Sequence, residues 1–240
     1  MNRFVFVTPM RNAHATLRQM INSVIAQSYD SWRIILIDDA SSEESVKATK
    51  KITEQCNTFL QQEKITAIHQ QERRWETANV LAALNLCISD EIVCRLDADD
   101  WLVDSDALAI IDSVYENQKC DALWTKHRWS YTTYNISDTL PENADPYKHA
   151  WVTSHLKTWR AELSHGINDL NYRNESGEYV KRAGDQAIYL PVLYRAKRKL
   201  FLPLVTYHYT IDMRAETFAS DDAKFQKAEA DFLRSRGFIR

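Results

Sequence analysis

The chain has 240 residues, 45% of them hydrophobic and 26% charged, which is the range of one large α/β domain with a substantial core. Its net charge of −3 at pH 7 argues against tight nonspecific binding to nucleic acid. No run of about eighteen apolar residues occurs, and the apolar stretch at the N-terminus is too short for a signal peptide, so we expect a cytoplasmic protein without stable membrane insertion.

Strand and helix patterns alternate along the first half of the chain. Arg3–Val7 is a β-rich run, and apolar residues at helical spacing follow it between Leu17 and Ile25. The run Trp32–Ile37 is almost continuously apolar, as in a strand that is covered on both faces. The alternation predicts an α/β fold with a right-handed, doubly wound, mostly parallel sheet. Its further predicted elements are a helix near Glu43–Gln61, a strand Lys64–Ile68, a helix near Thr77–Ile88 and a strand Glu91–Leu96.

The alternation ends in the second half of the chain. After a predicted helix around Asp106–Asn117 and a strand near Ala122–Trp129, residues 130–155 show no clear period. This stretch favours a long functional loop or a covering subdomain on the acceptor side. No repeat or linker divides the chain, so residues 1–240 are expected to form one domain. The remaining predicted elements are a helix near Gly184–Arg195, a strand near Leu200–Tyr209 and a helical tail from Ser220 to Phe238.

Polar clusters follow three of the predicted strands. In an open parallel sheet the ligand crevice lies beyond the carboxyl ends of the strands, so these clusters are expected to meet there. Either pair of acids alone would also be explained as the cap of the next helix. Acids this close together repel one another unless a cation offsets their charge, which a hard divalent metal does. The clusters are Thr8-Pro9-Met10-Arg11-Asn12, Asp38-Asp39 and Asp97-Ala98-Asp99-Asp100.

The order and spacing of these clusters, P-x-x-N, then IDDAS, then RLDADDW, resembles glycosyltransferase family 2. The resemblance is strong from about Arg3 to Trp101 and looser beyond. It implies a GT-A (Rossmann-like) fold in which residues 1–101 bind the nucleotide sugar, while residues 102–240 form the acceptor-binding half and the C-terminal helix. It also implies a metal-dependent, inverting transfer of one sugar from a nucleoside-diphosphate sugar, with UDP favoured, to an acceptor hydroxyl.

The resemblance implies roles for several residues of the donor half. Pro9 and Arg11 would line the nucleotide base and ribose, and Asp39 would accept a hydrogen bond from the base. Asn79 fits the end of a donor-binding segment in which the family carries Gly-Gly and an Arg-Asn pair. Two arginines of this segment are the candidates to replace the family's arginine, Arg73 and Arg74.

The metal site is also implied by the resemblance. Asp97 and Asp99 fill the D-x-D motif that holds Mg²⁺ or Mn²⁺ against the donor diphosphate, and Asp97 therefore contacts the donor as well. Asp100 is a further candidate for the same duty. His208, at the end of a late strand, matches a region from which some GT-A enzymes supply another metal ligand. A half-buried histidine in an aromatic strand is the alternative.

The base of an inverting transfer is implied to be Asp185. Ala183-Gly184-Asp185-Gln186-Ala187 resembles the family's acidic helix start, although Gly184 stands where the first acid of the usual pair would be. Asp185 would deprotonate the acceptor hydroxyl as it attacks, and a plain helix N-cap is the alternative. Ser154–Trp159 resembles an element that begins a helix beside the donor, where His155 would contact phosphate or acceptor unless it is structural.

The acceptor is the least determined part of the function. A glycan is favoured, and the lack of any apolar run long enough for a membrane helix argues for single transfers rather than chain polymerisation. The basic stretch Arg195–Lys199 permits a second hypothesis, a phage-type enzyme that glycosylates modified bases in DNA. Aromatic residues of the second half form either an acceptor platform or core. They are Trp124, Trp129, Tyr131, Tyr134, Tyr147, Trp151 and Trp159.

Two other classes of protein fit the sequence less well. A nucleotidyltransferase would carry a glycine-rich phosphate loop after its first strand, but the chain has four glycines and none precedes Gly166. A non-catalytic nucleotide-sugar-binding module would lack metal or base acids, whereas Asp97, Asp99 and Asp185 are all present. The sequence does not identify the donor sugar or the oligomeric state.

Overall fold

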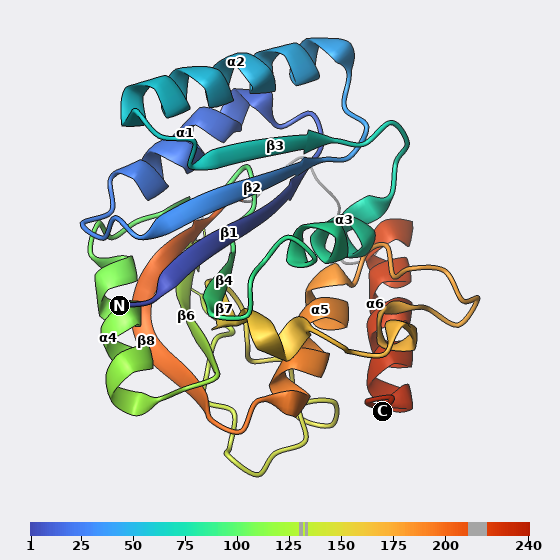
Figure 1. Cartoon of the computed structure of the whole chain (residues 1–240). Coiled ribbons are helices and arrows are strands. Elements are labelled where there is room, and N and C mark those ends of the chain that lie inside the picture. The colour runs from blue at the N-terminus through green and yellow to red at the C-terminus, as the bar shows by residue number, and fades with distance from the viewer. Residues whose placement is uncertain (130–131, 133, 211–219) are drawn as a thin grey trace.

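Figure 1 shows the computed structural model of the chain, which describes residues 1–129, 132, 134–210 and 220–240. No helix in these ranges combines the length and the apolar character needed to cross a membrane. The strands are β1 (Arg3–Met10), β2 (Trp32–Asp38), β3 (Ile65–His69), β4 (Glu91–Arg95), β5 (Trp101–Leu102), β6 (Ala122–Trp129), β7 (Lys157–Arg160) and β8 (Lys199–Tyr209). The α-helices are α1 (His14–Ile25), α2 (Glu43–Leu60), α3 (Trp75–Leu84), α4 (Ala107–Gln118), α5 (Gly184–Arg195) and α6 (Asp221–Arg236).

All eight strands belong to one sheet, in the order β3-β2-β1-β4-β7-β6-β8-β5. β1 lies at its centre between β2 and β4 and runs parallel to both. β7 is antiparallel to both of its neighbours, and β5 is antiparallel to β8. The other six strands run in one direction, so the predicted mostly parallel sheet is confirmed. The carboxyl ends of β1, β2 and β4 therefore meet at one edge, as expected.

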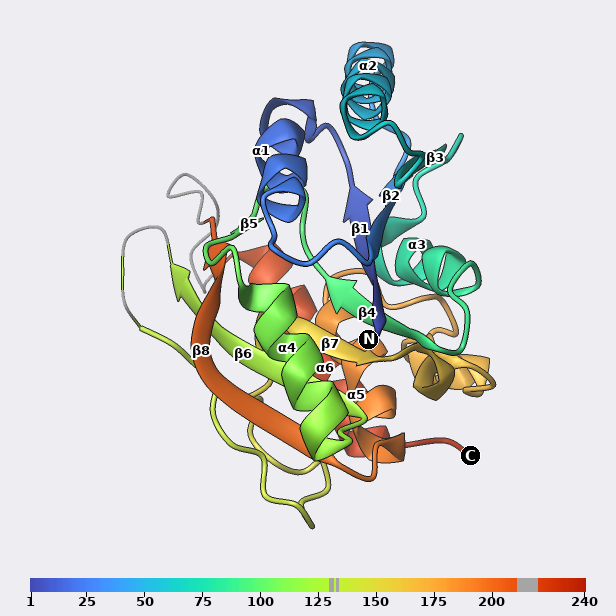
Figure 2. The same cartoon turned by 60° about the vertical axis from the view of Figure 1, so that its left-hand side comes forward.

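The sheet is covered on both faces because side chains alternate along its strands. In β1, Phe4 and Phe6 join the core beneath α1, α2 and α4, whereas Val5 and Val7 join the core beneath α3 and α5. Figure 2 shows these helices on either side of the sheet. Helix α6 packs outside α5, with Leu233 of α6 in the same small buried cluster as Ala187 of α5. This is the doubly wound arrangement that the alternating sequence pattern predicts.

The second half of the chain differs from the expectation at two places. Ser154–Trp159 does not begin an α-helix, because Lys157–Arg160 forms β7, which pairs with β4 and β6 in the middle of the sheet. The two-residue strand β5 was not predicted either. Between Trp129 and Lys157 the described residues form no helix or strand, which agrees with the irregular stretch expected there.

The aromatic residues of the second half contribute largely to the core. Trp124, Tyr147 and Trp159 are buried, so core packing rather than acceptor binding explains these three. Tyr134 is exposed. Tyr131 lies outside the described residues.

A buried ion pair at the start of β4 gives a test of stability. Glu91 is fully buried and accepts hydrogen bonds from the Nε and Nη2 atoms of Arg33, each 2.7 Å long, and from the Ile88 amide. Burial alone would raise the pKa of Glu91, but Arg33 and the Ile88 amide outweigh it and hold the pKa below its usual range. The pair therefore stabilises the fold above a pH of about 4.3, the ordinary value of a glutamate pKa, and the stabilisation is lost as the pH falls through the lowered folded-state pKa.

We expect Glu91→Gln to lower the free energy of unfolding by about 2–4 kcal/mol at pH 7, because the change leaves Arg33 without its carboxylate. The difference from the wild type should shrink in acid, where Glu91 of the wild type is protonated. Urea denaturation at pH 7 and below pH 4 measures both effects, with the exposed Glu54→Gln as the control. Equal loss of stability in the two variants would contradict the role given to this ion pair.

Candidate active site

A pocket of about 730 Å³ lies at the carboxyl ends of β1, β2 and β4. The first residues of α3 and α5 and the end of β8 complete its wall, together with Gln226 of α6. The structure thus brings together side chains that are far apart in the sequence. The predicted site residues that line the pocket are Pro9, Arg11, Asp39, Asn79, Asp97, Asp99 and Asp185.

The three acids after β4 differ in what they contact. Both oxygens of Asp100 are already engaged, because Tyr207 donates its hydroxyl at 2.5 Å and Thr210 donates its amide at 2.7 Å. Burial and the Asp97 carboxylate raise the pKa of Asp100 to about 8. Partial loss of hydration and Asp97 also raise the pKa of Asp99, whose carboxylate has only its own backbone amide as a hydrogen-bond partner among the described residues. Asp97 and Asp99 are therefore the acids available to a ligand, and Asp100 fastens the loop to β8.

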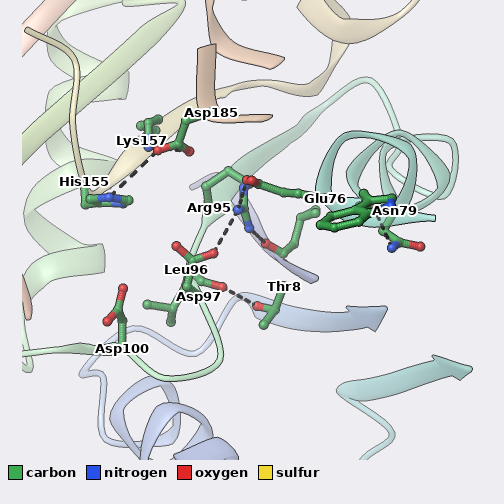
Figure 3. A network of polar contacts seen from close by, with 12 residues as sticks. Thr8, Glu76, Asn79, Arg95, Leu96, Asp97, Asp100, His155, Lys157 and Asp185 are labelled. Carbon is green, nitrogen blue, oxygen red and sulfur yellow. Dashed lines mark hydrogen bonds and ion pairs between the residues drawn. The ribbon is translucent and has the colours of Figure 1, made fainter. Parts of the chain in front are cut away.

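A buried arginine fixes the orientation of Asp97. Arg95, at the end of β4, donates through Nη1 to the carbonyl oxygen of Val7 at 2.8 Å. Its Nη2 atom lies 2.9 Å from carboxylate oxygens of both Glu76 and Asp97 (Figure 3). The three contacts join β1, the start of α3 and the D-x-D loop. Burial raises the pKa of Glu76 to about 7 in spite of the favourable charge of Arg95.

Asp185 stands across the pocket from these acids, in the first turn of α5 (Figure 3). Its Oδ1 atom accepts a hydrogen bond of 2.8 Å from the buried Nζ of Lys157 in β7, and its Oδ2 atom lies 4.0 Å from Nε2 of His155. Burial alone would raise the pKa of Asp185, but Lys157, His155 and Arg95 outweigh it and hold the pKa well below its usual range. Asp185 is therefore deprotonated at neutral pH, as a proton acceptor must be.

His155 is the histidine that lines the pocket. Its ring stacks against Tyr207 and Tyr209, and burial lowers its pKa to about 3, so the ring is neutral at pH 7. His208 lies elsewhere: its ring stacks on Trp101 at a centroid distance of 3.8 Å, and its Nδ1 accepts a hydrogen bond from Arg128. It is not among the described residues of the pocket wall, so the structure does not bring His208 to Asp97 and Asp99 as the sequence analysis expected.

The two acids after β2 have separate roles. Asp38 is buried and bonded to Ser41 and to Nδ1 of His69, outside the pocket wall. Asp39 lines the pocket, and its oxygens accept the amides of Arg74 at 2.6 Å and Trp75 at 3.1 Å. It therefore holds the start of α3, while each carboxylate oxygen has further acceptor capacity for a ligand.

Two arginines lie beside Trp75 and form a cationic rim on one side of the pocket. The guanidinium of Arg73 lies 3.4 Å from the centroid of the indole, and that of Arg182 lies 5.1 Å from it. Trp75 has a φ angle of +64°, which is unfavourable for a bulky residue and costs about 1–3 kcal/mol. Arg73 rather than Arg74 lines the pocket and is the better match to the arginine expected in this segment.

Asn79, on the next turn of α3, is fully buried yet lines the same pocket. Its Nδ2 donates to the Trp75 carbonyl oxygen at 2.8 Å, but its Oδ1 has no hydrogen-bond partner within the described ranges. A buried acceptor without a partner is costly unless a ligand or water supplies a donor. The geometry is consistent with the ligand contact predicted for Asn79.

The fit of these residues to a divalent cation depends on the kind of ligand atoms they offer. No group of three or more His, Cys, Asp or Glu side chains in the described ranges could hold a metal ion without other ligands. Asp97 and Asp99 offer oxygen ligands, the type that Mg²⁺ and Mn²⁺ prefer, and proximity to Asp97 raises the pKa of Asp99. A cation there would relieve this repulsion, so the acids fit a metal that takes its other ligands from bound substrate and water.

Helix α6 supports the turn that precedes Asp185. The buried Glu229 accepts hydrogen bonds from three successive amides before α5, those of Lys181, Arg182 and Ala183, at distances of 2.7 to 3.3 Å. Asp185 follows two residues later. Glu229 therefore compensates amides that would otherwise be unpaired at the N-terminus of α5.

We expect Glu229→Ala to lower the free energy of unfolding by about 1–3 kcal/mol, because it leaves these amides unpaired in a buried turn. Glu229→Gln keeps one acceptor oxygen and should lose less. Chemical denaturation of the two variants measures the effect. Unchanged stability of the alanine variant would show that the turn holds itself without Glu229.

Three charged residues of the site had no role assigned from the sequence. Arg95, Lys157 and Glu76 lie close to Asp97 or Asp185, but Arg95 was only the first letter of the RLDADDW pattern, and the other two belong to no strand-end cluster. The one available signal was a charge at the end of each apolar strand pattern, in Cys94-Arg95-Leu96 and Leu156-Lys157-Thr158. A charge in a buried strand requires a partner, and the acids of the pocket provide it.

The fold matches solved glycosyltransferases of the GT-A class. TarS from S. aureus (residues 1–349) with UDP superposes with a TM-score of 0.67 at 16% identity, over 87% of this chain and 60% of that one. The mannosyltransferase PcManGT from Pyrobaculum calidifontis, in complex with GDP-Man and Mn²⁺, gives a TM-score of 0.61 at 17% identity, over 88% and 58% of the two chains. The expected GT-A fold is thereby confirmed.

The sequence itself identifies the family. Residues 5–165 match the family described as "Glycosyl transferase family 2", and the chain belongs to that family. Glycosyltransferase GlyA of Streptococcus pneumoniae is 21% identical over 215 residues, covering 79% of this chain and 29% of GlyA. The putative glycosyltransferase EpsE of Bacillus subtilis is 29% identical over 92 residues, covering 37% and 30%. The chain thus spans less than a third of these curated relatives.

Proposed function

We propose that the protein is a metal-dependent, inverting glycosyltransferase that moves one sugar from a nucleoside-diphosphate sugar to an acceptor hydroxyl. The observation that carries this proposal is a single pocket with Asp97 and Asp99 on one side and a deprotonated Asp185 on the other. The first pair suits a cation and diphosphate, and Asp185 suits proton removal. A non-catalytic binding module would need no such proton acceptor.

The donor is proposed from the pocket and from the structural neighbours. TarS structures contain UDP or UDP-GlcNAc, and PcManGT contains GDP-Man and Mn²⁺. In this chain Pro9, Arg11 and Asp39 line the pocket and would surround the base and ribose. Arg73 and Asn79 would contact the donor from α3 and the loop before it. UDP is the favoured nucleotide.

Asp97 and Asp99 would hold Mn²⁺ or Mg²⁺. When bound, the cation would offset the negative charge of the leaving diphosphate. Arg95 fixes the Asp97 carboxylate from behind, so this ligand is held in place before substrate arrives. Preorganisation of this kind lowers the cost of binding.

Asp185 is the proposed base. Its carboxylate would take the proton of the acceptor hydroxyl as that oxygen attacks the anomeric carbon from the face opposite the diphosphate. Lys157 holds Oδ1 at 2.8 Å and so leaves Oδ2 as the oxygen for the acceptor. The neutral His155 ring, 4.0 Å from Oδ2, closes the pocket beside it without competing for the proton.

A glycan remains the proposed acceptor, and the described residues of the basic stretch give no support to DNA. The basic stretch Arg195–Lys199 lies at the C-terminal end of α5, whereas Asp185 lies at its N-terminal end. Several of its charged groups form hydrogen bonds within the protein. Arg195, for example, donates to the carbonyl oxygens of Leu163 and His165. A helix of this length separates the stretch from the pocket by roughly 15–18 Å.

A donor screen tests the proposed function. Release of nucleoside diphosphate is followed for UDP-glucose, UDP-galactose, UDP-GlcNAc and GDP-mannose, with Mn²⁺ or Mg²⁺ present. We expect slow hydrolysis of one donor, with water in place of the acceptor. Binding of a nucleotide sugar without any turnover would favour the binding module, and absence of both binding and turnover would contradict the proposal.

A further inference from the structure

Glu76 and Gly184 occupy one space at the floor of the pocket. Gly184 is the first residue of α5, and a Cβ atom added there would lie 2.6 Å from Cδ and 3.0 Å from Cγ of Glu76. The Glu76 side chain from α3 therefore fills the volume that any larger residue at position 184 would need. The Glu76 carboxylate of α3 fits here because Gly184 of α5 has no side chain at that point.

The two oxygens of this carboxylate are used differently. Oε1 is held by Nη2 of Arg95 at 2.9 Å, and Oε2 makes no hydrogen bond to any residue that the structure describes. Glu76 lines the pocket, and Figure 3 shows its carboxylate between Asp97 below and Asp185 above. A partly buried carboxylate oxygen without a donor is costly, so a ligand with hydrogen-bond donors would stabilise it.

The surroundings of Glu76 limit what this ligand can be. Burial and the negative charges of Asp185 and Asp97 raise the pKa of Glu76, and the same two charges disfavour a phosphate at this point of the pocket. The base and ribose have their own proposed partners in the pocket, Asp39 and Arg11. What remains is a neutral group with hydroxyl donors, lying between the cation-binding acids and the base.

We propose that Oε2 of Glu76 accepts a hydrogen bond from a hydroxyl of the sugar that is transferred, and that Glu76 thereby helps determine which donor sugar is used. This proposal rests on the proposed function and adds to it a residue that discriminates the sugar rather than the nucleotide. Arg95 orients the carboxylate, and Gly184 leaves room for it.

The test compares affinities for a nucleotide sugar and for the nucleotide alone. Calorimetry is performed with the nucleotide sugar that wild type binds best in the donor screen and with the matching nucleoside diphosphate, both with Mn²⁺. We expect Glu76→Ala to weaken the affinity for the nucleotide sugar about 10- to 100-fold, which is the range for a hydrogen bond to a charged group. The affinity for the nucleoside diphosphate should change less than about threefold. Glu76→Gln keeps the shape of the side chain, so it tests the charge separately.

Two further variants control for a structural role. Glu72→Ala removes a carboxylate that is exposed, four residues earlier and not in the pocket wall, and should change neither affinity. In the double variant E76A/G184E the carboxylate comes from α5 instead of α3, and we expect most of the lost sugar affinity to return. A structural role for Glu76 would not give this recovery.

The outcomes separate the two proposals. If wild type binds no nucleotide sugar of the panel, the proposed function fails and this inference fails with it. A second outcome is that wild type binds a nucleotide sugar while Glu76→Ala lowers the affinities for nucleotide sugar and nucleotide equally, or lowers neither. In that case only the role of Glu76 is overturned. A folded E76A/G184E protein without recovery would likewise contradict a carboxylate acting from this space.

Discussion

Replacement of Asp185 by asparagine is expected to slow donor hydrolysis by about 100- to 10,000-fold, the usual contribution of a general base. Asparagine keeps the size and hydrogen-bonding shape of the side chain but does not accept a proton. Calorimetric affinity for the nucleotide sugar should change only a few-fold, because the proposed role of Asp185 is to face the attacking oxygen rather than the nucleotide. The matched control is Asp90→Asn, an exposed acid directly before β4 and outside the pocket wall.

The pH dependence gives a second view of the same residue. Lys157 holds the pKa of Asp185 below its usual range, so the base of the wild type stays deprotonated down to a pH of about 4 or lower. Lys157→Met removes that charge while burial still favours the protonated form, so the acidic limb of the rate profile should move to higher pH. Rates measured from pH 4 to pH 9 would show this, provided the melting temperature confirms that the variant is folded.

An unchanged rate in Asp185→Asn would assign proton removal to another group, and Asp185 would then be only the first-turn acid of α5. A loss of rate with an acidic limb that does not move in Lys157→Met would separate the base from its proposed ion pair. Either result can occur without the other. Together the two measurements therefore distinguish the identity of the base from the cause of its low pKa.

Loss of an acid proposed to bind the cation is the second large effect that we expect. Asp99→Ala should reduce donor hydrolysis by at least about 100-fold, which corresponds to roughly 2.7 kcal/mol of transition-state stabilisation. The same loss is expected when a chelator removes the cation from wild type, and added Mn²⁺ or Mg²⁺ should restore activity to wild type but not to the variant. Asp90→Asn serves again as the control.

Binding of Mn²⁺ itself provides a readout that does not depend on turnover. Titration in the presence of UDP should show one site in wild type and a much weaker one in Asp99→Ala. If hydrolysis by wild type proceeds at full rate in the chelator, the cation is not required and the paired acids must serve the substrate directly.

The sequence predicted the donor half well because its signals are local. The apolar runs of β1, β2 and β4 are followed directly by their polar clusters, and a parallel sheet must place such strand ends together. Every residue predicted for the donor therefore lines the pocket, although their contacts with a ligand remain predictions. For the same reason Asp185, at a helix start with its own sequence pattern, was found.

The rest of the site depends on contacts between distant segments. Nothing local in Ser154–Trp159 distinguishes the start of a helix from β7, because the strand is defined by pairing with β4 and β6. The position of His208 has the same origin: register with β5 sets its ring on Trp101, away from the described pocket wall. Lys157 and Arg95 were missed since a charged residue in an apolar strand has meaning only once its partner is placed.

The single guanidinium that joins Val7, Glu76 and Asp97 bears on how the enzyme could be redesigned. Three acceptors in different directions suit the planar fork of arginine and not the point charge of lysine, so position 95 should be held constant in any library of variants. Positions 76 and 184, by contrast, share one small volume beside it. Paired randomisation of these two positions is a compact way to seek enzymes with altered sugar preference while the cation-binding loop is preserved.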